Sequence, residues 1–224
     1  TLNQGFKGYS LRRHLGDSLL SSTTMTMLSD TPSSRQEIRK LIRQRRRALT
    51  SEQQAQFSEQ AATRLMAYPS VLMAHTVAVF LSFDGELDTQ PLIEQLWRSG
   101  KRVYLPVLHP FSPGNLLFLH YHPQSVLVIN RLKILEPKLD VRDVLPLEKL
   151  DVLVTPLVAF DEQGQRLGMG GGFYDRTLQH WQRYNVQPVG FAHDCQQVGE
   201  LPVEEWDIPL PAVVTPSTVW EWPR

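Results

Sequence analysis

The fold of this chain is predicted from one stretch, Gln163-Gly-Gln-Arg-Leu-Gly-Met-Gly-Gly-Gly-Phe-Tyr-Asp-Arg176, which holds five of its thirteen glycines. Residues 151–160 come just before it and are too apolar for a half-exposed strand, so they predict a strand that is buried on both faces. Residues 173–184 predict a helix after the glycines. A strand, a glycine loop and a helix in this order are typical of a phosphate site, because the helix N-terminus favours anions.

Four glycines give this loop its chemistry: Gly168, Gly170, Gly171 and Gly172. Glycine tolerates positive φ and lets a ligand approach the main chain, so successive N–H groups can point at one anion. Three charged neighbours, Arg166, Asp175 and Arg176, offer two cations for a phosphate and one carboxylate for Mg²⁺. The alternative is a glycine-rich surface turn, since turns also recruit glycine.

The residue order of the loop does not match two common nucleotide-binding motifs, the Walker A loop and the dinucleotide fingerprint. A Walker A loop ends in Gly-Lys-Ser/Thr, whereas Gly172 is followed by Phe173 and Tyr174. The dinucleotide fingerprint needs a small residue three positions after its second glycine, and counting from Gly170 that position is Phe173. Asp194 lies near the acidic position of that fingerprint, but this alone is weak support, so a nicotinamide site is disfavoured.

The composition predicts one globular domain in a reducing compartment. The chain has 224 residues, 42% of them hydrophobic, which is ample for one core. Its single cysteine, Cys195, excludes an internal disulfide and is assigned no role. No apolar run approaches the roughly 18 residues of a membrane span. We therefore expect a soluble, cytoplasmic protein. A monomer is expected as well, but the sequence itself does not give the oligomeric state.

The first 34 residues are expected to be a disordered or non-native extension. They are rich in Ser and Thr and have no sustained apolar period. Met25 and Met27 suggest that the natural chain begins at one of them. The domain is therefore predicted to span residues 35–224.

A basic amphipathic helix is predicted for residues 34–49, with Ser34 as its N-cap. Seven of the thirteen residues from Arg35 to Arg47 are basic, which leaves a solvated helix face and a nucleic-acid-binding face as alternatives. A third interpretation is that Arg35 and Arg39, one turn apart, reach phosphates held on the glycine loop.

The rest of the chain alternates between strands and helices. Strands are expected at residues 75–83, 102–108, 116–121, 125–129, 188–192 and 212–215, and helices at 52–67 and 91–99. This order predicts an α/β fold, a three-layer α/β/α open, mostly parallel (mixed) sheet of Rossmann-like type with N-terminal helices. Ligands of such sheets bind beyond the carboxyl ends of the strands.

Polar residues that follow the expected strands are therefore candidates for binding a substrate or a metal ion. Glu86 follows the first strand and can accept hydrogen bonds from a substrate that carries amide or amine groups. His120 and His122 share a strand face, but no third ligand is evident, so an exposed hairpin is the better interpretation. Asp207 could join Asp175 at a cation, and the sequence alone leaves that pairing open.

Four motifs in this order resemble the 5-formyltetrahydrofolate cyclo-ligase family over about residues 35–220. They are the glycine loop with its Phe-Tyr-Asp ending, the helix with Arg35 and Arg39, the segment Phe80-Leu-Ser-Phe-Asp-Gly-Glu-Leu-Asp-Thr89, and the segment Leu201-Pro-Val-Glu-Glu-Trp-Asp-Ile-Pro209. The resemblance implies an enzyme that converts 5-formyltetrahydrofolate and ATP, with Mg²⁺, to 5,10-methenyltetrahydrofolate, ADP and phosphate.

The resemblance also implies roles for individual residues. The ATP-binding positions fall on Arg35, Arg39, Arg166, Leu167, Gly168, Met169, Gly170, Gly171, Gly172, Phe173 and Tyr174. Arg35 stands where the family often has lysine, which keeps the charge but changes the geometry. The folate positions fall on Leu81 and Glu86, and the Mg²⁺ carboxylates on Asp175 and Asp207.

Phosphoryl transfer needs positioning and charge neutralisation from the protein, and no nucleophilic side chain. Arg166 and Arg39 are therefore the expected catalytic residues. Two other hypotheses remain. One is a nucleic-acid-binding protein that uses the basic helix 35–47, and the other is a nucleotide-dependent enzyme that acts on another substrate.

Overall fold

The computed structural model describes residues 34–224, so the expectation of an N-terminal extension lies almost wholly outside the described residues. Within residues 34–224, no helix is both long enough and apolar enough to cross a membrane.

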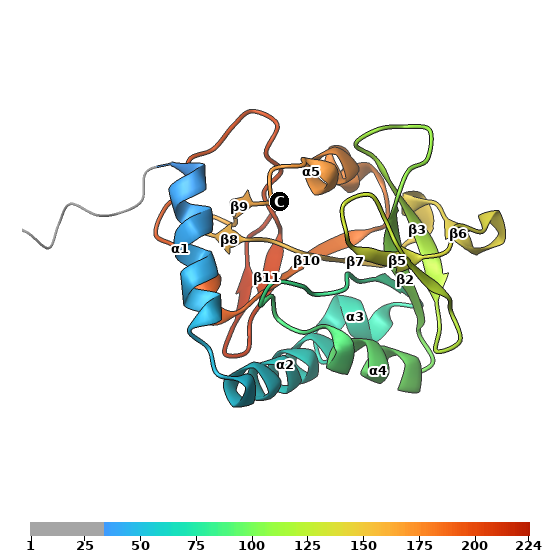
Figure 1. Ribbon diagram of the computed structural model, residues 1–224, viewed down its shortest axis with the longest axis horizontal. Helices are drawn as coiled ribbons and strands as arrows, with labels where there is room; N and C mark the ends of the chain where they lie inside the picture. The colour runs from blue at the N-terminus through green and yellow to red at the C-terminus, as the bar shows by residue number, and fades with distance from the viewer. Residues whose placement is uncertain (1–33) are drawn as a thin grey trace, which may run out of the picture. The chain divides into compact units, whose positions relative to one another are not determined.

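The centre of the fold is an eight-stranded mixed sheet with the order β12-β11-β10-β7-β1-β2-β3-β6 (Figure 1). The strands are β1 Thr76–Ala78, β2 Arg102–Leu108, β3 Leu116–Tyr121, β6 Val144–Leu145, β7 Val152–Thr155, β10 Gln187–Phe191, β11 Ala212–Val214 and β12 Val219–Glu221. The five strands from β11 to β2 run parallel, whereas β3 and β12 pair antiparallel at the two sides. The mostly parallel, mixed sheet is therefore as predicted.

Helices cover both faces of the sheet. They are α1 Arg35–Arg47, α2 Ser51–Met66, α3 Pro69–Met73, α4 Gln90–Arg98 and α5 Phe173–Leu178. On one face, α2 and α4 pack apolar side chains such as Leu65 and Leu96 against the sheet. On the other face, Leu178 of α5 and the nearby Trp181 cover a thinner layer of the core. Helix α1 stands beside β8 and β9 (Figure 1) and buries Ile38 against that hairpin.

The helix starts follow from their capping residues. The Ser34 hydroxyl accepts the N–H of Glu37 at 3.1 Å, which fixes the first turn of α1. Thr50 and Gln53 form a reciprocal capping box at the start of α2, with bonds of 3.1 and 2.9 Å. The predicted bounds of these two helices are therefore close to the observed ones.

The predicted strand 151–160 is wrong as one continuous element. Strand β7 ends at Thr155, and Pro156, which has no N–H to offer a ladder, follows it. Strands β8 (Ala159–Phe160) and β9 (Arg166–Leu167) then form a separate hairpin. The glycine loop consequently follows β9, which belongs to this hairpin and not to the central sheet.

The helix after the glycine loop is also shorter than predicted. Helix α5 ends at Leu178, and a 3₁₀ turn, Trp181–Arg183, follows it. Six residues align few peptide dipoles. An anion at this loop must therefore rely on local N–H groups and arginines more than on a helix dipole.

A small hairpin of β4 (Leu127–Ile129) and β5 (Leu135–Pro137) lies over the sheet. Strand β4 lies within the predicted strand 125–129, and it pairs with β5, which the prediction missed together with β12. The Glu136 carboxylate accepts the N–H of Leu108 at 3.0 Å and ties the hairpin to the end of β2. The hairpin thereby becomes a wall at the carboxyl edge of the sheet.

Candidate active site

A cavity of about 400 Å³ lies at the carboxyl ends of the parallel strands. Most of the predicted site residues line it: Arg35, Leu81, Glu86, Arg166, Asp175 and every residue from Gly168 to Tyr174. Three predicted residues, Arg39, Leu167 and Asp207, do not line it. Arg39 and Asp207 instead contact the lining residues Gly168 and Arg35. The structure thus brings segments from the first helix and from the second half of the chain to one place.

The glycine loop adopts a conformation that needs glycine at two positions. Gly170 has φ 108° and Gly172 has φ 70°, both in the left-handed region. The carbonyl of Gly168 accepts the Arg39 Nε–H at 2.9 Å, so α1 holds the first part of the loop. A Cβ placed on Gly170 would lie 3.7 Å from the Arg39 guanidinium, which shows how closely the two segments approach.

Arg166 is a buried cation beneath the glycine loop. Its side chain is 4% exposed, and neither Nε nor Nη1 has a hydrogen-bond partner within the described chain. Burial lowers the pKa of its guanidinium, and the nearby Asp175 carboxylate opposes this shift. The guanidinium lies 5.9 Å from the ring centre of Tyr174, whose pKa burial raises. Buried donors without partners indicate a place for an anionic ligand.

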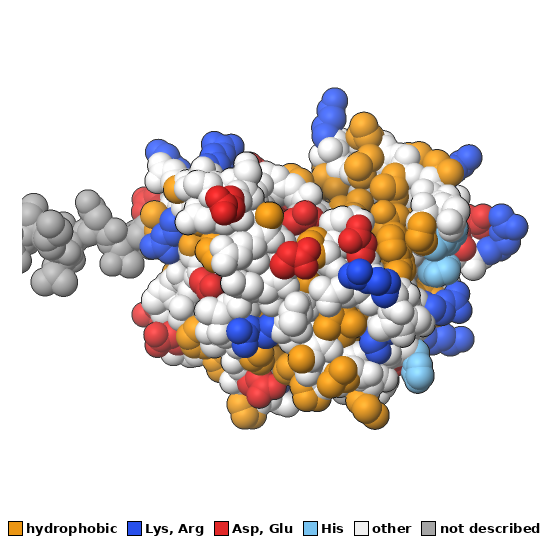
Figure 2. All heavy atoms as spheres, turned by 90° about the horizontal axis from the view of Figure 1, so that it is seen from below, with side chains coloured by type: hydrophobic (Ala, Val, Ile, Leu, Met, Phe, Trp, Pro, Cys, Tyr) orange, Lys and Arg blue, Asp and Glu red, His pale blue; other side chains and the backbone are white. Residues whose placement is uncertain are grey.

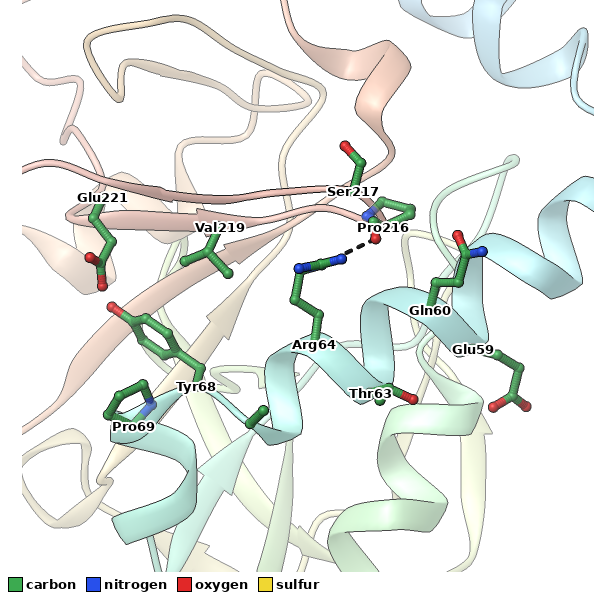
Figure 3. A pocket seen from close by; sticks show the side chains of 11 residues that line it. Glu59, Gln60, Thr63, Arg64, Tyr68, Pro69, Pro216, Ser217, Val219 and Glu221 are labelled. Carbon is green, nitrogen blue, oxygen red and sulfur yellow. Dashed lines mark hydrogen bonds between the residues drawn. The ribbon is translucent and has the colours of Figure 1, made fainter.

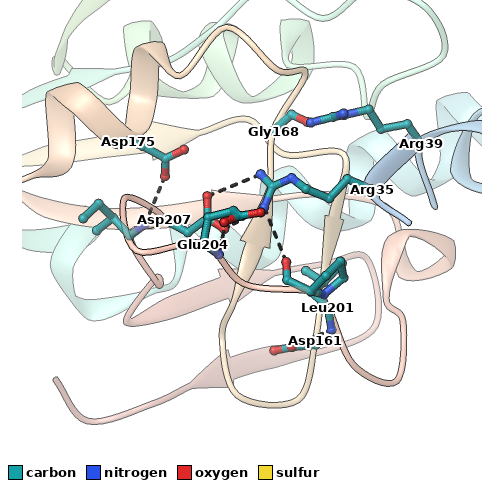
Figure 4. A network of polar contacts seen from close by, with 10 residues as sticks. Arg35, Arg39, Asp161, Gly168, Asp175, Leu201, Glu204 and Asp207 are labelled. Carbon is teal, nitrogen blue, oxygen red and sulfur yellow. Dashed lines mark hydrogen bonds and ion pairs between the residues drawn. The ribbon is translucent and has the colours of Figure 1, made fainter. Parts of the chain in front are cut away.

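Arg35 and Asp207 bind one another (Figure 4). Arg35 Nη1 lies 2.7 Å from Asp207 Oδ2, and Nη2 lies 3.3 Å from Oδ1. The pair raises the pKa of Arg35, and the Glu204 N–H also donates to Oδ2 at 2.9 Å. Both oxygens of Asp207 therefore accept hydrogen bonds. The Arg35 guanidinium is directed at this carboxylate and not at a phosphate position on the glycine loop.

Asp175 is the more available of the two predicted metal ligands. Its Oδ1 accepts the N–H of Ile208 at 3.1 Å, while Oδ2 takes no hydrogen bond from the described residues (Figure 4). Across residues 34–224, no group of three or more His, Cys, Asp or Glu side chains is arranged to hold a metal ion. A Mg²⁺ ion at Asp175 would therefore need further oxygens from a ligand.

Arg176 braces the loop. Its Nε donates to the carbonyl of Gly114 at 2.7 Å, its Nη2 donates to the carbonyl of Gly171, and its guanidinium stacks 5.5 Å from the Phe173 ring centre. The sequence had offered Arg176 as a second cation for phosphate. Two of its nitrogens instead join the glycine loop to the loop between β2 and β3, which the sequence did not reveal.

Glu86 lies in a tight turn that lines the same cavity. Positive φ values at Asp84 (50°) and Gly85 (76°) turn the chain, and Glu86 Oε1 accepts the Phe83 N–H at 3.4 Å. Burial raises the pKa of Glu86 to about 7, and the positive charge of Arg46 opposes this rise. A carboxylate in this position can accept N–H donors from a planar ligand.

The walls between Glu86 and the glycine loop are mostly apolar. Leu81 and residues of the β4–β5 hairpin, among them Leu132 and Ile134, face the cavity, and Trp206 stands at its rim with 63% of its side chain exposed. Sequence reasoning missed the hairpin and Trp206, because short strands and loops give no periodic signal.

Arg46 was also missed, although the sequence contained a signal for it. The buried residues of α1 are Ile38, Ile42 and Arg46, which follow one another at intervals of four. This interval places Arg46 on the apolar stripe of the helix and separates it from the other arginines.

Two other candidates lie outside the cavity. The His120 and His122 rings are 5.3 Å apart, and both residues are half-buried, so the exposed position expected for them is wrong. A larger and more open hollow of about 1160 Å³ lies between α2 and the β11–β12 turn (Figure 3). There Arg64 donates to the Pro216 carbonyl at 3.1 Å, and none of the predicted site residues lines the hollow.

Comparisons with known sequences agree with the resemblance. A model of the 5-formyltetrahydrofolate cyclo-ligase family matches residues 31–216. The 5-formyltetrahydrofolate cyclo-ligase of Escherichia coli (strain K12) is 84% identical over 182 residues, which are 81% of this chain and 100% of that protein. The protein of the same name from Haemophilus influenzae is 53% identical over 176 residues, 79% of this chain and 94% of that one.

Solved structures agree with the fold. The NMR structure of 5,10-methenyltetrahydrofolate synthetase from Aquifex aeolicus has a TM-score of 0.71 at 30% identity and covers 84% of this chain and 92% of that chain. The synthetase structure from Mycoplasma pneumoniae has a TM-score of 0.65 at 22% identity over 82% of this chain and 99% of that chain, and it supports the fold alone. The predicted α/β fold is confirmed.

Proposed function

The chain belongs to the 5-formyltetrahydrofolate cyclo-ligase family, and we propose that it uses ATP to convert 5-formyltetrahydrofolate to 5,10-methenyltetrahydrofolate. ADP and phosphate are the other products. The observation that carries the proposal from this chain's own residues is the buried Arg166, whose two unpartnered nitrogens lie beneath the glycine loop at one end of the cavity.

ATP is placed with its phosphates on the glycine loop. The loop N–H groups, Arg166 below them and Arg39 beside them supply donors and positive charge for the phosphate oxygens. Leu167, Met169, Phe173 and Tyr174 complete this ATP site as its framework. Arg35 joins it if its ion pair with Asp207 opens when the nucleotide binds.

The folate ring is placed at the opposite end of the cavity. Its pterin presents an amino group and a ring N–H on one edge, and the Glu86 carboxylate can accept both. Leu81 packs beside the ring, and the apolar wall of the β4–β5 hairpin covers the rest of the substrate. This arrangement directs the N5-formyl group toward the glycine loop.

The chemistry begins with the formyl oxygen, which is a poor leaving group. It attacks the γ-phosphorus of ATP, and ADP departs, which leaves an iminium-like carbon that bears a phosphate ester. N10 then attacks this carbon and loses its proton. Phosphate leaves with the former formyl oxygen, and the methenyl product remains. Arg166 and Arg39 stabilise the charge that spreads over the transferred phosphoryl oxygens.

Mg²⁺ fits this site through one side chain more readily than through two. Asp175 has a carboxylate oxygen without a hydrogen bond, and phosphate oxygens of ATP would supply the remaining ligands. Asp207 could join only after it releases Arg35. When bound, the ion would neutralise phosphate charge. The residues of the site would hold the γ-phosphate of ATP in line with the formyl oxygen.

The nucleic-acid alternative is weakened by where the basic side chains of α1 point. Six of its seven basic residues contact other parts of the same chain: Arg35, Arg39, Arg43, Arg45, Arg46 and Arg47. On the face that carries α2 and α4 (Figure 2), acidic and basic side chains are interspersed and form no continuous basic field. A cytoplasmic location and a monomeric state remain part of the proposal.

The proposal is tested by following the absorbance of the methenyl product after protein, Mg-ATP and 5-formyltetrahydrofolate are mixed. We expect an increase that requires ATP and that matches the ADP formed mole for mole. If folded protein produced no ATP-dependent absorbance, the function would be a different one. ADP formation that needs another co-substrate would favour the hypothesis of a nucleotide-dependent enzyme on another substrate.

A further inference from the structure

Arg46 is a buried cation that the proposed chemistry does not use. It lies on the inner stripe of α1, is 6% exposed and lines the same cavity as Glu86. Its Nε has no hydrogen-bond partner in the described chain. Its Cβ would lie 3.4 Å from a Cβ added to Gly85, so α1 packs directly on the turn that carries Glu86.

Burying this guanidinium is costly unless a negative charge compensates it. Arg46 Nη2 has one ion-pair partner, Asp84 Oδ2, at the long distance of 3.8 Å. The same carboxylate is shared with the exposed Arg43 and Arg47, each at 3.4 Å. One carboxylate thus serves three arginines. Glu86 is the further carboxylate on this turn, and it shares the cavity with Arg46.

We propose that Arg46, which packs on the turn of Glu86 and lines the same cavity, is a positioning residue for folate binding, because its positive charge stabilises the Glu86 carboxylate that accepts both N–H groups of the pterin edge. The inference rests on the proposed function, since it assumes that Glu86 binds the folate ring. Arg46 acts through Glu86 and need not touch the reacting atoms.

The groups that face Glu86 support this role. Burial raises its pKa to about 7, the neighbouring Asp84 raises it further, and Arg46 and the Phe83 N–H oppose the rise. Tyr174 is uncharged at neutral pH, as a phenol ordinarily is, and burial raises its pKa further. His193 is buried near Arg46 and the Gly85 backbone, and burial together with Arg46 lowers its pKa to about 4, so it adds no charge at neutral pH.

Loss of Arg46 should therefore make Glu86 a weaker acid. A protonated Glu86 keeps only one good acceptor for the two pterin donors. A carboxyl group tenfold weaker than one of pKa about 7 would be about one-tenth ionised at pH 7 in place of one-half. We expect the KM for 5-formyltetrahydrofolate in Arg46→Met to rise about fivefold at pH 7 and to return toward the wild-type value near pH 9.

Two further variants make the test specific. Arg46→Lys retains the charge, so it should keep most of the wild-type pH profile even if its packing is poorer. Arg47→Met removes a charge from the same helix and breaks the shorter contact with Asp84, but its side chain is 66% exposed and lies outside the cavity lining. It should leave the KM for 5-formyltetrahydrofolate unchanged at every pH.

The measurement is KM for 5-formyltetrahydrofolate between pH 6 and 9 for each variant, with KM for ATP as the second readout. An increase for Arg46→Met that is equal at all pH values, or an equal effect of Arg47→Met, would overturn the inference. If Arg46→Met does not fold, the pH dependence of KM in Arg46→Lys becomes the test. A rise of KM at low pH that begins at a pH well away from that of wild type would contradict the role of charge. Absence of wild-type turnover would instead overturn the proposed function.

Discussion

Arg166 has guanidinium N–H groups that the folded chain leaves without hydrogen-bond acceptors in its described part, and these groups are available to a ligand. The residue is 4% exposed, and two of its three guanidinium nitrogens lack partners in the described chain. A buried charge in this state is unfavourable for folding. A phosphate that arrives at the glycine loop would give those nitrogens acceptors, so binding recovers what folding left unsatisfied.

The first prediction concerns this residue. Arg166→Met should lower kcat by about 10³ because it removes a cation from the transferred phosphoryl group. It should leave the KM for 5-formyltetrahydrofolate nearly unchanged, and thermal unfolding should show a folded protein, since Met fills similar space without a buried charge. Arg142→Met is the matched control, because Arg142 is exposed and forms an ion pair with Asp140 outside the cavity lining. Turnover of Arg166→Met equal to that of the control would remove Arg166 from the mechanism.

The second prediction concerns Glu86, whose pKa is raised to about 7 from its usual value. The unfolded chain releases this proton at lower pH than the folded chain does, so Glu86 lowers the free energy of unfolding as pH rises from about 4.5 to 7, and the loss persists above that. Glu86→Gln should therefore stabilise the protein by about 1–3 kcal/mol at pH 8 and by much less at pH 4.5.

The same Glu86→Gln variant should bind 5-formyltetrahydrofolate far more weakly, because the amide offers one acceptor and two donors to an edge that presents donors. Thermal unfolding at the two pH values and KM for the folate are the measurements. A variant that is less stable than wild type at pH 8 would show that the Glu86 charge is better compensated than the structure indicates.

At the scale of elements, the site is made of segments that brace one another. The glycine loop is held by Arg39 of α1 on one side and by Arg176 of α5 on the other. Arg176 reaches Gly114 in the loop after β2, where glycine has φ 83° and a Cβ would come within 2.7 Å of the Arg176 side chain. Disturbing that distant glycine should therefore loosen the ATP site.

Gly114→Ala tests this coupling. The new methyl group would displace Arg176, and alanine would also strain the positive φ at this position at a cost of about 1 kcal/mol. We expect the KM for ATP to rise severalfold while the KM for 5-formyltetrahydrofolate stays near the wild-type value. Gly199→Ala is the control, since no atom lies within 4 Å of its added Cβ. Equal KM values for ATP in the two variants would argue against the brace.

Elements with strong local signals were predicted well. The apolar period and the capping residues Ser34 and Thr50 determined α1 and α2. The break in residues 151–160 was missed because both halves are equally apolar, although Pro156 marks the point where β7 ends, and β8 pairs with β9. Strand β4 lies within the predicted strand 125–129, but its partner β5 was missed, because strands of three residues form through tertiary contacts.

At the scale of the whole molecule, the mixed sheet and the place of the cavity could be predicted, because alternating strands and helices impose a right-handed parallel arrangement. The positions that line the cavity could be predicted only where a motif named them. The mutual pairing of Arg35 and Asp207 could not, since residues 172 positions apart meet only after folding. Their roles as phosphate and metal ligands remain predictions.

The central claim is that ATP activates the formyl oxygen of the folate. The most direct test uses 5-formyltetrahydrofolate labelled with ¹⁸O in the formyl group, with mass spectrometry of the phosphate released in single-turnover and steady-state reactions. If ATP activates the formyl oxygen, each released phosphate carries one oxygen from the formyl group. Unlabelled phosphate, with the label recovered in water, would contradict it.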